Sequence, residues 1–101
     1  MTLLSLKIHR SQRETVVAVC DSEILGMKFH DDGRRIEVYS SFYGGSLIRE
    51  EELEGYLKAS TIMNLVGRRT VGLAITLGYV DPDRVLTIGE TVHAQGATMQ
   101  K

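Results

Sequence analysis

The sequence contains few of the residue types that build specialised sites or folds. Its 101 residues include one cysteine, one proline and no tryptophan. The single cysteine, Cys20, excludes an intramolecular disulfide and any zinc motif of paired cysteines, and it is typical of a reducing compartment. With 43% hydrophobic residues and one proline, the composition is not that of a collagen-like or disordered chain. We therefore expect an ordinary globular protein.

The sequence also has no excess of one charge sign and no long apolar run. It has twelve basic and thirteen acidic side chains, which gives a net charge of -1. A nucleic-acid partner would therefore have to be held by a local basic patch. No run approaches the roughly 18 apolar residues of a membrane span, and the first residues lack the layout of a signal peptide. We expect a cytoplasmic protein with no membrane partner.

The first half of the sequence has the patterns of β-strands. Apolar and polar residues alternate over residues 3–9, which predicts a strand with one dry face. The apolar run over residues 15–20 predicts a second strand that is covered on both faces and forms a hairpin with the first. Alternation after a turn signal predicts a third strand over residues 34–40, and the paired glycines that follow predict a loop over residues 42–46.

The second half changes to helical spacing. The positions of Leu53 and Leu57 predict a helix over residues 48–59, whose first turn holds three glutamates. The apolar stripe that begins at Val71 predicts a second helix, which ends at Gly78. The segment 62–67 between them fits either a short strand or part of a helix, because brief apolar runs do not distinguish the two.

The order of these elements predicts the fold class. Residues 84–88 predict a last strand, and residues 90–101, which are small, polar and aperiodic, predict a loop or a loosely ordered tail. Strands, then helices, then a strand indicate a single α+β domain over residues 1–101. In it, two principal helices pack against a single, mostly antiparallel β-sheet.

Residues that could carry chemistry are scattered. Cys20 ends an apolar strand, a place typical of buried cysteines, so we interpret it as structural. His9, His30 and His93 are not paired with Cys20 or each other at the short spacings that hold a metal ion. We therefore predict no catalytic residue, no metal and no cofactor.

Two predicted helices begin after glycines, and their first turns differ in charge. Gly44 and Gly45 precede the helix whose first turn holds three glutamates, which would repel a phosphate. Gly67 precedes Arg68 and Arg69, which would place two cations beside free backbone N–H groups. Gly67, Arg68 and Arg69 are therefore the predicted anion-binding site.

Four short stretches together resemble a known family. They are Val19-Cys20-Asp21, Phe42-Tyr43-Gly44-Gly45, Asn64-Leu65-Val66-Gly67 and His93-Ala94-Gln95. With them the chain resembles, over almost its whole length, a family of small archaeal proteins known as domain of unknown function 424. The resemblance implies an archaeal, cytosolic, single-domain α+β protein with an association with translation or ribonucleoproteins. It implies no activity and no functional residues.

A recognition surface is predicted where two of these stretches follow predicted strands. Tyr43 would offer an aromatic platform, Gly44 and Gly45 would admit a partner close to the backbone, and His93 and Gln95 would supply donors and acceptors. The alternative is that the tyrosine packs into the core, the glycines only turn the chain, and the two polar residues cap loops.

These observations favour a non-catalytic binding module, with structured RNA or a ribonucleoprotein as the preferred partner. The alternative is a protein–protein adaptor or homodimer that uses a sheet edge or the helix face formed by Leu53, Tyr56 and Leu57. A second alternative is a small enzyme that uses Cys20 or His93, which would need a cleft with convergent titratable groups.

Overall fold

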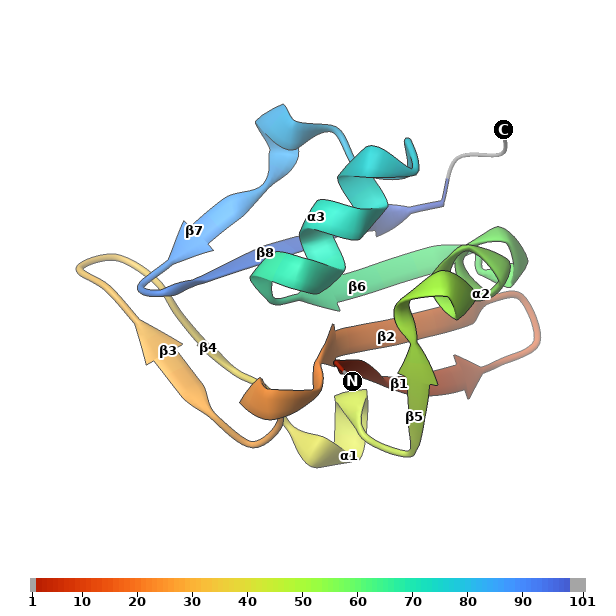
Figure 1. Cartoon of the computed structure of the whole chain (residues 1–101), viewed down its shortest axis with the longest axis horizontal. Helices are drawn as coiled ribbons and strands as arrows, with labels where there is room; N and C mark the ends of the chain where they lie inside the picture. The colour runs from red at the N-terminus through yellow and green to blue at the C-terminus, as the bar shows by residue number, and fades with distance from the viewer. Residues whose placement is uncertain (1, 99–101) are drawn as a thin grey trace.

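The computed structural model describes residues 2–98 and is built around one six-stranded sheet (Figure 1). The strand order is β5-β1-β2-β6-β8-β7, and every neighbouring pair is antiparallel except β2 and β6, which are parallel. The bounds of these strands are β1 (Leu3–Arg10), β2 (Thr15–Asp21), β5 (Ser46–Arg49), β6 (Ile62–Val66), β7 (Leu86–Ile88) and β8 (Thr91–Ala97). A separate two-stranded hairpin consists of β3 (Lys28–His30) and β4 (Arg35–Glu37).

Two helices cover one face of the sheet, namely α2 (Leu53–Ala59) and α3 (Arg68–Thr76) (Figure 1). The remaining helical segments are short: η1 (Ser22–Ile24), α1 (Ser40–Tyr43), η2 (Glu50–Glu52) and η3 (Pro82–Arg84). No helix within residues 2–98 is long and apolar enough to cross a membrane.

The larger hydrophobic core lies between the sheet and these two helices. Alternate residues of β1, β2 and β6 point toward it, as the two-residue period of a strand requires. Its buried members are Leu4, Leu6, Val17, Val19, Ile48, Leu53, Leu57, Met63, Leu65, Val71, Ala74, Tyr79 and Ala94. Leu53 and Leu57 are fully buried in it, so the α2 face that contains them packs against the sheet and is not available as a docking surface.

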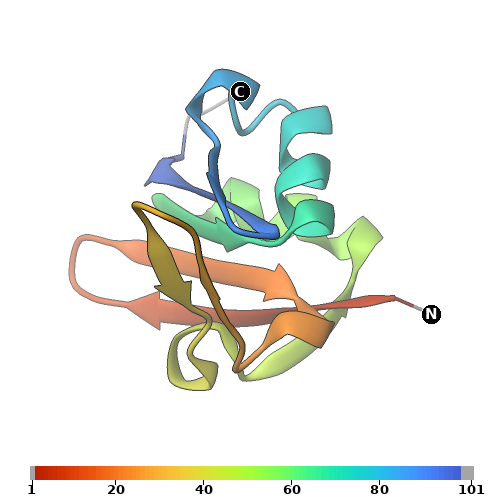
Figure 2. The same cartoon turned by 90° about the vertical axis from the view of Figure 1, so that its left-hand side faces the viewer.

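A smaller core lies on the opposite face, where the hairpin β3–β4 and α1 cover part of the sheet (Figure 2). Its buried members are Ala18, Cys20, Val38, Tyr43 and Val66. The hairpin tip is held at the β7–β8 turn, where Arg34 Nη1 donates to the Thr87 carbonyl at 3.2 Å and Gly89 N–H donates to Asp31 at 3.1 Å. The cover is partial, and the rest of this face is open.

The fold class is confirmed in its coarse form: a mostly antiparallel sheet with two principal helices against it, with β3–β4 as a second small sheet. The first two strands, their hairpin pairing and the helix at 68–76 agree with the prediction. Segment 62–67, whose sequence fits either a strand or a helix, contains strand β6, which pairs with β2 on one side and β8 on the other.

Four expected elements were wrong in the described residues. The loop predicted over 42–46 is reduced to Gly44 and Gly45, because Phe42 and Tyr43 belong to α1 and Ser46 begins β5. The tail predicted over 90–101 is instead strand β8 over Thr91–Ala97, in the sheet between β6 and β7, while residues 99–101 lie outside the described part. The strand predicted over 34–40 is only Arg35–Glu37, because the chain turns into α1 at Ser40. The helix predicted from residue 48 begins later, because residues 46–49 extend as an edge strand beside β1.

Candidate functional site

Asn64 is the centre of a side-chain network on the partly open face of the sheet. It lies on β6, directly opposite Gln95 of β8, and both side chains point to the same face. The Tyr43 hydroxyl, from the end of α1, donates to Asn64 Oδ1. His93 Nε2 lies 3.1 Å from the same oxygen, and Asn64 Nδ2 donates to Gln95 Oε1 at 3.2 Å. The structure thus brings together three of the residues predicted to form one surface.

A groove of about 650 Å³ opens over this network. Its lining comes from β1, β2, β6, β8 and α1, so segments far apart in sequence meet there. The lining residues are His9, Glu14, Val16, Phe42, Thr61, Ile62, Asn64, Gln95, Gly96 and Ala97. The groove therefore has an apolar floor with two adjacent amide groups.

Aromatic rings form one side of the groove. The His9 imidazole stacks on the Phe42 ring with 4.6 Å between centroids, and its Nε2 lies 2.9 Å from the Phe42 carbonyl oxygen. Phe42 in turn packs edge-to-face against Tyr43 at 5.0 Å. These contacts hold the rings in place before any partner binds.

Burial sets the protonation states in the network. It raises the pKa of the Tyr43 hydroxyl above the ordinary value of 10, with a smaller contribution from nearby Cys20. Burial also lowers the pKa of His93 below 6.5. At neutral pH the tyrosine is therefore protonated and able to donate, and the histidine is uncharged.

The roles expected for Tyr43 and the glycine pair need correction. The Tyr43 ring is only 4% exposed and belongs to the smaller core, so it is not an open platform and only its hydroxyl takes part in the network. A Cβ at Gly44 would lie 2.6 Å from the Ser40 carbonyl oxygen, so this glycine admits the chain's own backbone. Gly45 is exposed just before β5, outside the groove lining. His93 and Gln95 lie on strand β8 and not on a loop.

The predicted anion site at the start of α3 is occupied by the chain itself. Asp21, at the end of β2, accepts hydrogen bonds from the Arg69 and Thr70 backbone N–H groups at 3.2 and 2.8 Å, and from the Thr70 hydroxyl at 2.8 Å. A Cβ at Gly67, whose φ is 112°, would lie 2.6 and 2.7 Å from the two carboxylate oxygens. This glycine therefore makes room for Asp21, and the helix end already has its negative charge.

Arg69 is likewise used within the chain. Its guanidinium pairs with Glu23, lies 3.3 Å from Glu50, and donates to the Leu3 carbonyl at 2.8 Å. The hydrogen bond from Arg69 lowers the pKa of Glu23. Arg68 remains exposed and donates to the Glu90 carbonyl at 3.2 Å. The backbone N–H groups of Arg69 and Thr70 and the Arg69 guanidinium are thus already paired within the chain.

Cys20 is fully buried, as predicted for a structural cysteine. Burial and the charges of Asp21 and Glu23 raise its pKa from 9.0 to about 12. A thiol with that pKa is a poor nucleophile at neutral pH, because the thiolate is the reactive form. Among residues 2–98, no group of three histidine, cysteine, aspartate or glutamate side chains is placed to hold a metal ion.

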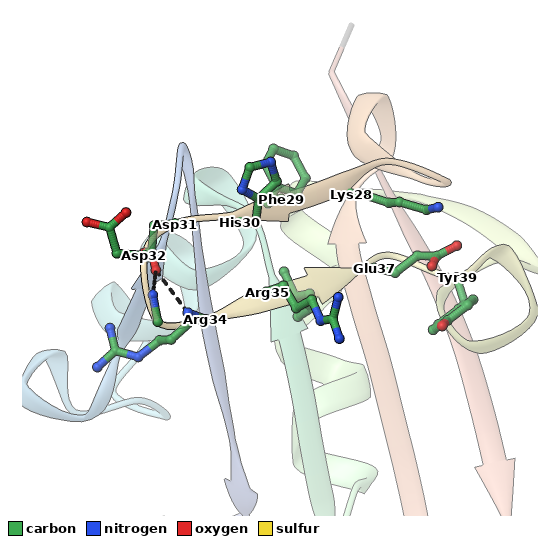
Figure 3. A pocket seen from close by; sticks show the side chains of 11 residues that line it. Lys28, Phe29, His30, Asp31, Asp32, Arg34, Arg35, Glu37 and Tyr39 are labelled. Atoms are coloured by element: carbon green, nitrogen blue, oxygen red, sulfur yellow. Dashed lines mark hydrogen bonds between the residues drawn. The ribbon is translucent and has the colours of Figure 1, made fainter.

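A second concavity, of about 840 Å³, lies along the β3–β4 hairpin (Figure 3). It is lined only by residues 28–37 and Tyr39, which are neighbours in sequence. Its three basic side chains, Lys28, Arg34 and Arg35, are matched by three acidic ones. Figure 3 shows these charges spread along the hairpin from the turn to the base. With no net charge and no convergent groups, it is a weaker candidate than the Asn64 groove.

Sequence reasoning missed Asn64 as a site residue, although it lies within one of the four stretches that carry the family resemblance. Asn64 is the one polar side chain on a strand of otherwise apolar residues, Ile62–Val66. Asparagine is unfavourable in strands, so its presence in a central one was a usable signal. Which partners it meets depends on β8, which the sequence pattern did not show.

Comparison with known proteins places the chain in a family but supplies no activity. A family model described as "Protein of unknown function (DUF424)" matches residues 9–99, so the chain belongs to this family, and the resemblance seen in the sequence is confirmed. The fold is similar to the crystal structure of an uncharacterized conserved protein from Methanopyrus kandleri, with a TM-score of 0.73 and 22% identity over 98% of this chain and 94% of that one. A search of curated proteins gave no match.

Proposed function

We propose that this member of the family is a non-catalytic binding module whose Asn64 groove receives an unpaired segment of a structured RNA. The observation that supports this best is the Asn64–Gln95 amide pair on the otherwise apolar floor of an open groove. Nucleobases combine apolar faces with hydrogen-bonding edges, and proteins read RNA mainly by binding unpaired bases in such surroundings.

The charge around the groove supports an anionic backbone on one side. Arg10 and Arg13 are exposed at the connection between β1 and β2, and each is next in sequence to a residue that lines the groove. Phosphate contacts of this kind hold a nucleic acid in place without reading its sequence. Glu14, which lines the groove beside these arginines, has the opposite charge and accepts a hydrogen bond from the Thr61 hydroxyl at 2.6 Å.

Binding of a labelled RNA hairpin to the full chain, followed by fluorescence anisotropy, tests the proposal. Asn64→Ala is expected to weaken binding about tenfold, since it removes the group that joins both sides of the network. Thr76→Ala, at the exposed end of α3 on the other face, is the matched control and should bind like the wild type. Equal affinity of wild type and Asn64→Ala would contradict the assignment.

The salt dependence of binding tests the phosphate contacts separately. Replacing Arg10 and Arg13 by alanine is expected to reduce the slope of log affinity against log salt by about 1.4, or about 0.7 for each single-strand phosphate. The double variant Lys58→Ala, Arg84→Ala removes the same charge from α2 and η3, outside the groove. It should leave the slope unchanged, and an equal loss in both doubles would indicate only a general charge effect.

A protein–protein contact is the second candidate, and one observation favours it. Leu47 is 63% exposed on β5, an edge strand of the sheet. Exposed apolar side chains on an edge are typical of surfaces that pair with another chain. Light scattering across a concentration series distinguishes the two: a dimer that Leu47→Lys dissociates, with no RNA binding, would favour this candidate over the RNA one.

A further inference from the structure

The hydrogen bonds of the Asn64 network run from the buried Tyr43 hydroxyl outward to the exposed Gln95. The Tyr43 hydroxyl is protonated at neutral pH and donates to Asn64 Oδ1. His93 Nε2 lies 3.1 Å from the same oxygen, so in this arrangement the Asn64 amide has its oxygen toward the core and its Nδ2 toward Gln95. Nδ2 can only donate, so Gln95 must turn its Oε1 toward Asn64. The Gln95 Nε2 group is then the outermost donor.

This order leaves a defined set of groups for a partner in the groove. An amide nitrogen carries two donors and an amide oxygen has two acceptor positions. Asn64 Nδ2 uses one N–H on Gln95, and Gln95 Oε1 uses one acceptor position on Asn64. Three groups are left for a partner, in the order donor, acceptor, donor. They are the remaining N–H of Asn64, the second acceptor position of Gln95 Oε1 and the N–H groups of Gln95 Nε2. Both residues line the groove.

We propose that the groove selects uracil among the RNA bases, with its imide edge against Asn64 and Gln95. This inference rests on the RNA-binding function proposed above. Uracil presents acceptor, donor, acceptor across O4, N3–H and O2, the complement of the protein's order. Cytosine presents a donor followed by two acceptors, guanine an acceptor followed by two donors, and adenine only one donor and one acceptor on that edge. A mismatched edge leaves polar groups of the site unpaired, which lowers affinity.

The apolar residues that line the groove suit a flat ring of this size. Val16, Ile62 and Ala97 provide apolar contacts on neighbouring strands, and Phe42 borders the groove from α1. Phe42 is already packed between His9 and Tyr43, so it contributes a fixed wall. The ring would therefore be held by apolar contact, while the two amides read its edge.

The test compares RNA hairpins with the same stem and single-stranded loops of about seven uridines or cytidines. Uridine loops are expected to bind the full chain about tenfold more tightly, because cytosine presents the wrong order of groups. Loops of N3-methyluridine keep the ring and both carbonyls but lose the central donor, and they should bind as weakly as cytidine. Equal binding of uridine, N3-methyluridine and cytidine loops would overturn the uracil assignment.

Variants of Gln95 separate this inference from the proposed function. Gln95→Glu replaces the outer donor with an acceptor, and Gln95→Met removes the polar groups at similar length. Both are expected to abolish the preference for uridine over cytidine. If Asn64→Ala weakens all loops while Gln95→Glu keeps the uridine preference, RNA binding stands and the reading edge is wrong. If no RNA hairpin binds to the wild type, both proposals fail.

Discussion

The molecule contains two polar clusters that differ in whether the chain itself satisfies them. Around Asp21, the carboxylate accepts three hydrogen bonds from the start of α3, and Arg69 contacts two further acidic residues and a backbone carbonyl. Around Asn64, the inner groups are paired, but Gln95 is exposed and both amides face a groove.

This difference explains why the anion-binding site expected at Gly67, Arg68 and Arg69 is not available. A helix N-terminus attracts a negatively charged group, and the start of α3 already binds the Asp21 carboxylate from the neighbouring strand β2. A cluster that is satisfied internally stabilises the fold. Unused donors and acceptors in an open groove can serve a partner, so the Asn64 cluster is the better candidate for binding.

The largest expected effect comes from breaking the closed cluster. Asp21→Ala should lower the free energy of unfolding by about 3 kcal/mol, because it leaves the Arg69 and Thr70 N–H groups and the Thr70 hydroxyl without their acceptor. Urea denaturation followed by circular dichroism measures this. Asp21→Asn keeps an acceptor oxygen and should cost less. RNA affinity of the folded variant should be unchanged, and a selective loss of affinity would place Asp21 in the site.

A smaller stability effect with a larger binding effect is expected in the open cluster. Asn64→Ala should cost about 1–2 kcal/mol in unfolding free energy, since it leaves the Tyr43 hydroxyl without its acceptor. The same variant is the one expected to lose about tenfold in RNA affinity. A loss of stability as large as that of Asp21→Ala, with unchanged RNA affinity, would make Asn64 a structural residue like Asp21.

The next largest effect is a pH dependence of stability that comes from His93 in the Asn64 cluster. His93 has a lowered pKa because of burial, so the unfolded chain takes up this proton more readily than the folded chain. Stability is therefore fully present above pH 6.5 and falls as the pH drops from 6.5 toward the lower pKa of the folded state. Melting curves between pH 7.5 and 5 should show a smaller decline for His93→Gln. Parallel curves for the two proteins would contradict a buried, neutral His93.

The smallest effect is expected at Arg68. Its side chain is exposed and makes one hydrogen bond, to the Glu90 carbonyl. Arg68→Ala should change the free energy of unfolding by no more than about 0.5 kcal/mol and should leave RNA binding unchanged. A clear drop in RNA affinity would restore the start of α3 as an anion site despite Asp21.

The sequence patterns predicted those elements whose own residues specify them. The alternation over β1, the apolar run of β2 and the stripe of α3 each bury a face that is visible in the local sequence. Strand β8 has no such signal, because Thr91–Ala97 is mostly small or polar. It is a strand because β6 and β7 provide hydrogen-bonding partners on both sides. Pairing partners of this kind are decided by the tertiary structure.

The sequence by itself determined the α+β class and the burial of Cys20. It also pointed to Tyr43, His93 and Gln95, but on separate segments. Only the tertiary structure decided that Asn64 connects them and that Asp21 closes the start of α3, contacts that span 21 to 49 residues of chain. A side chain's hydrogen-bonding partners depend on which strands lie side by side, and local patterns contain no record of that arrangement.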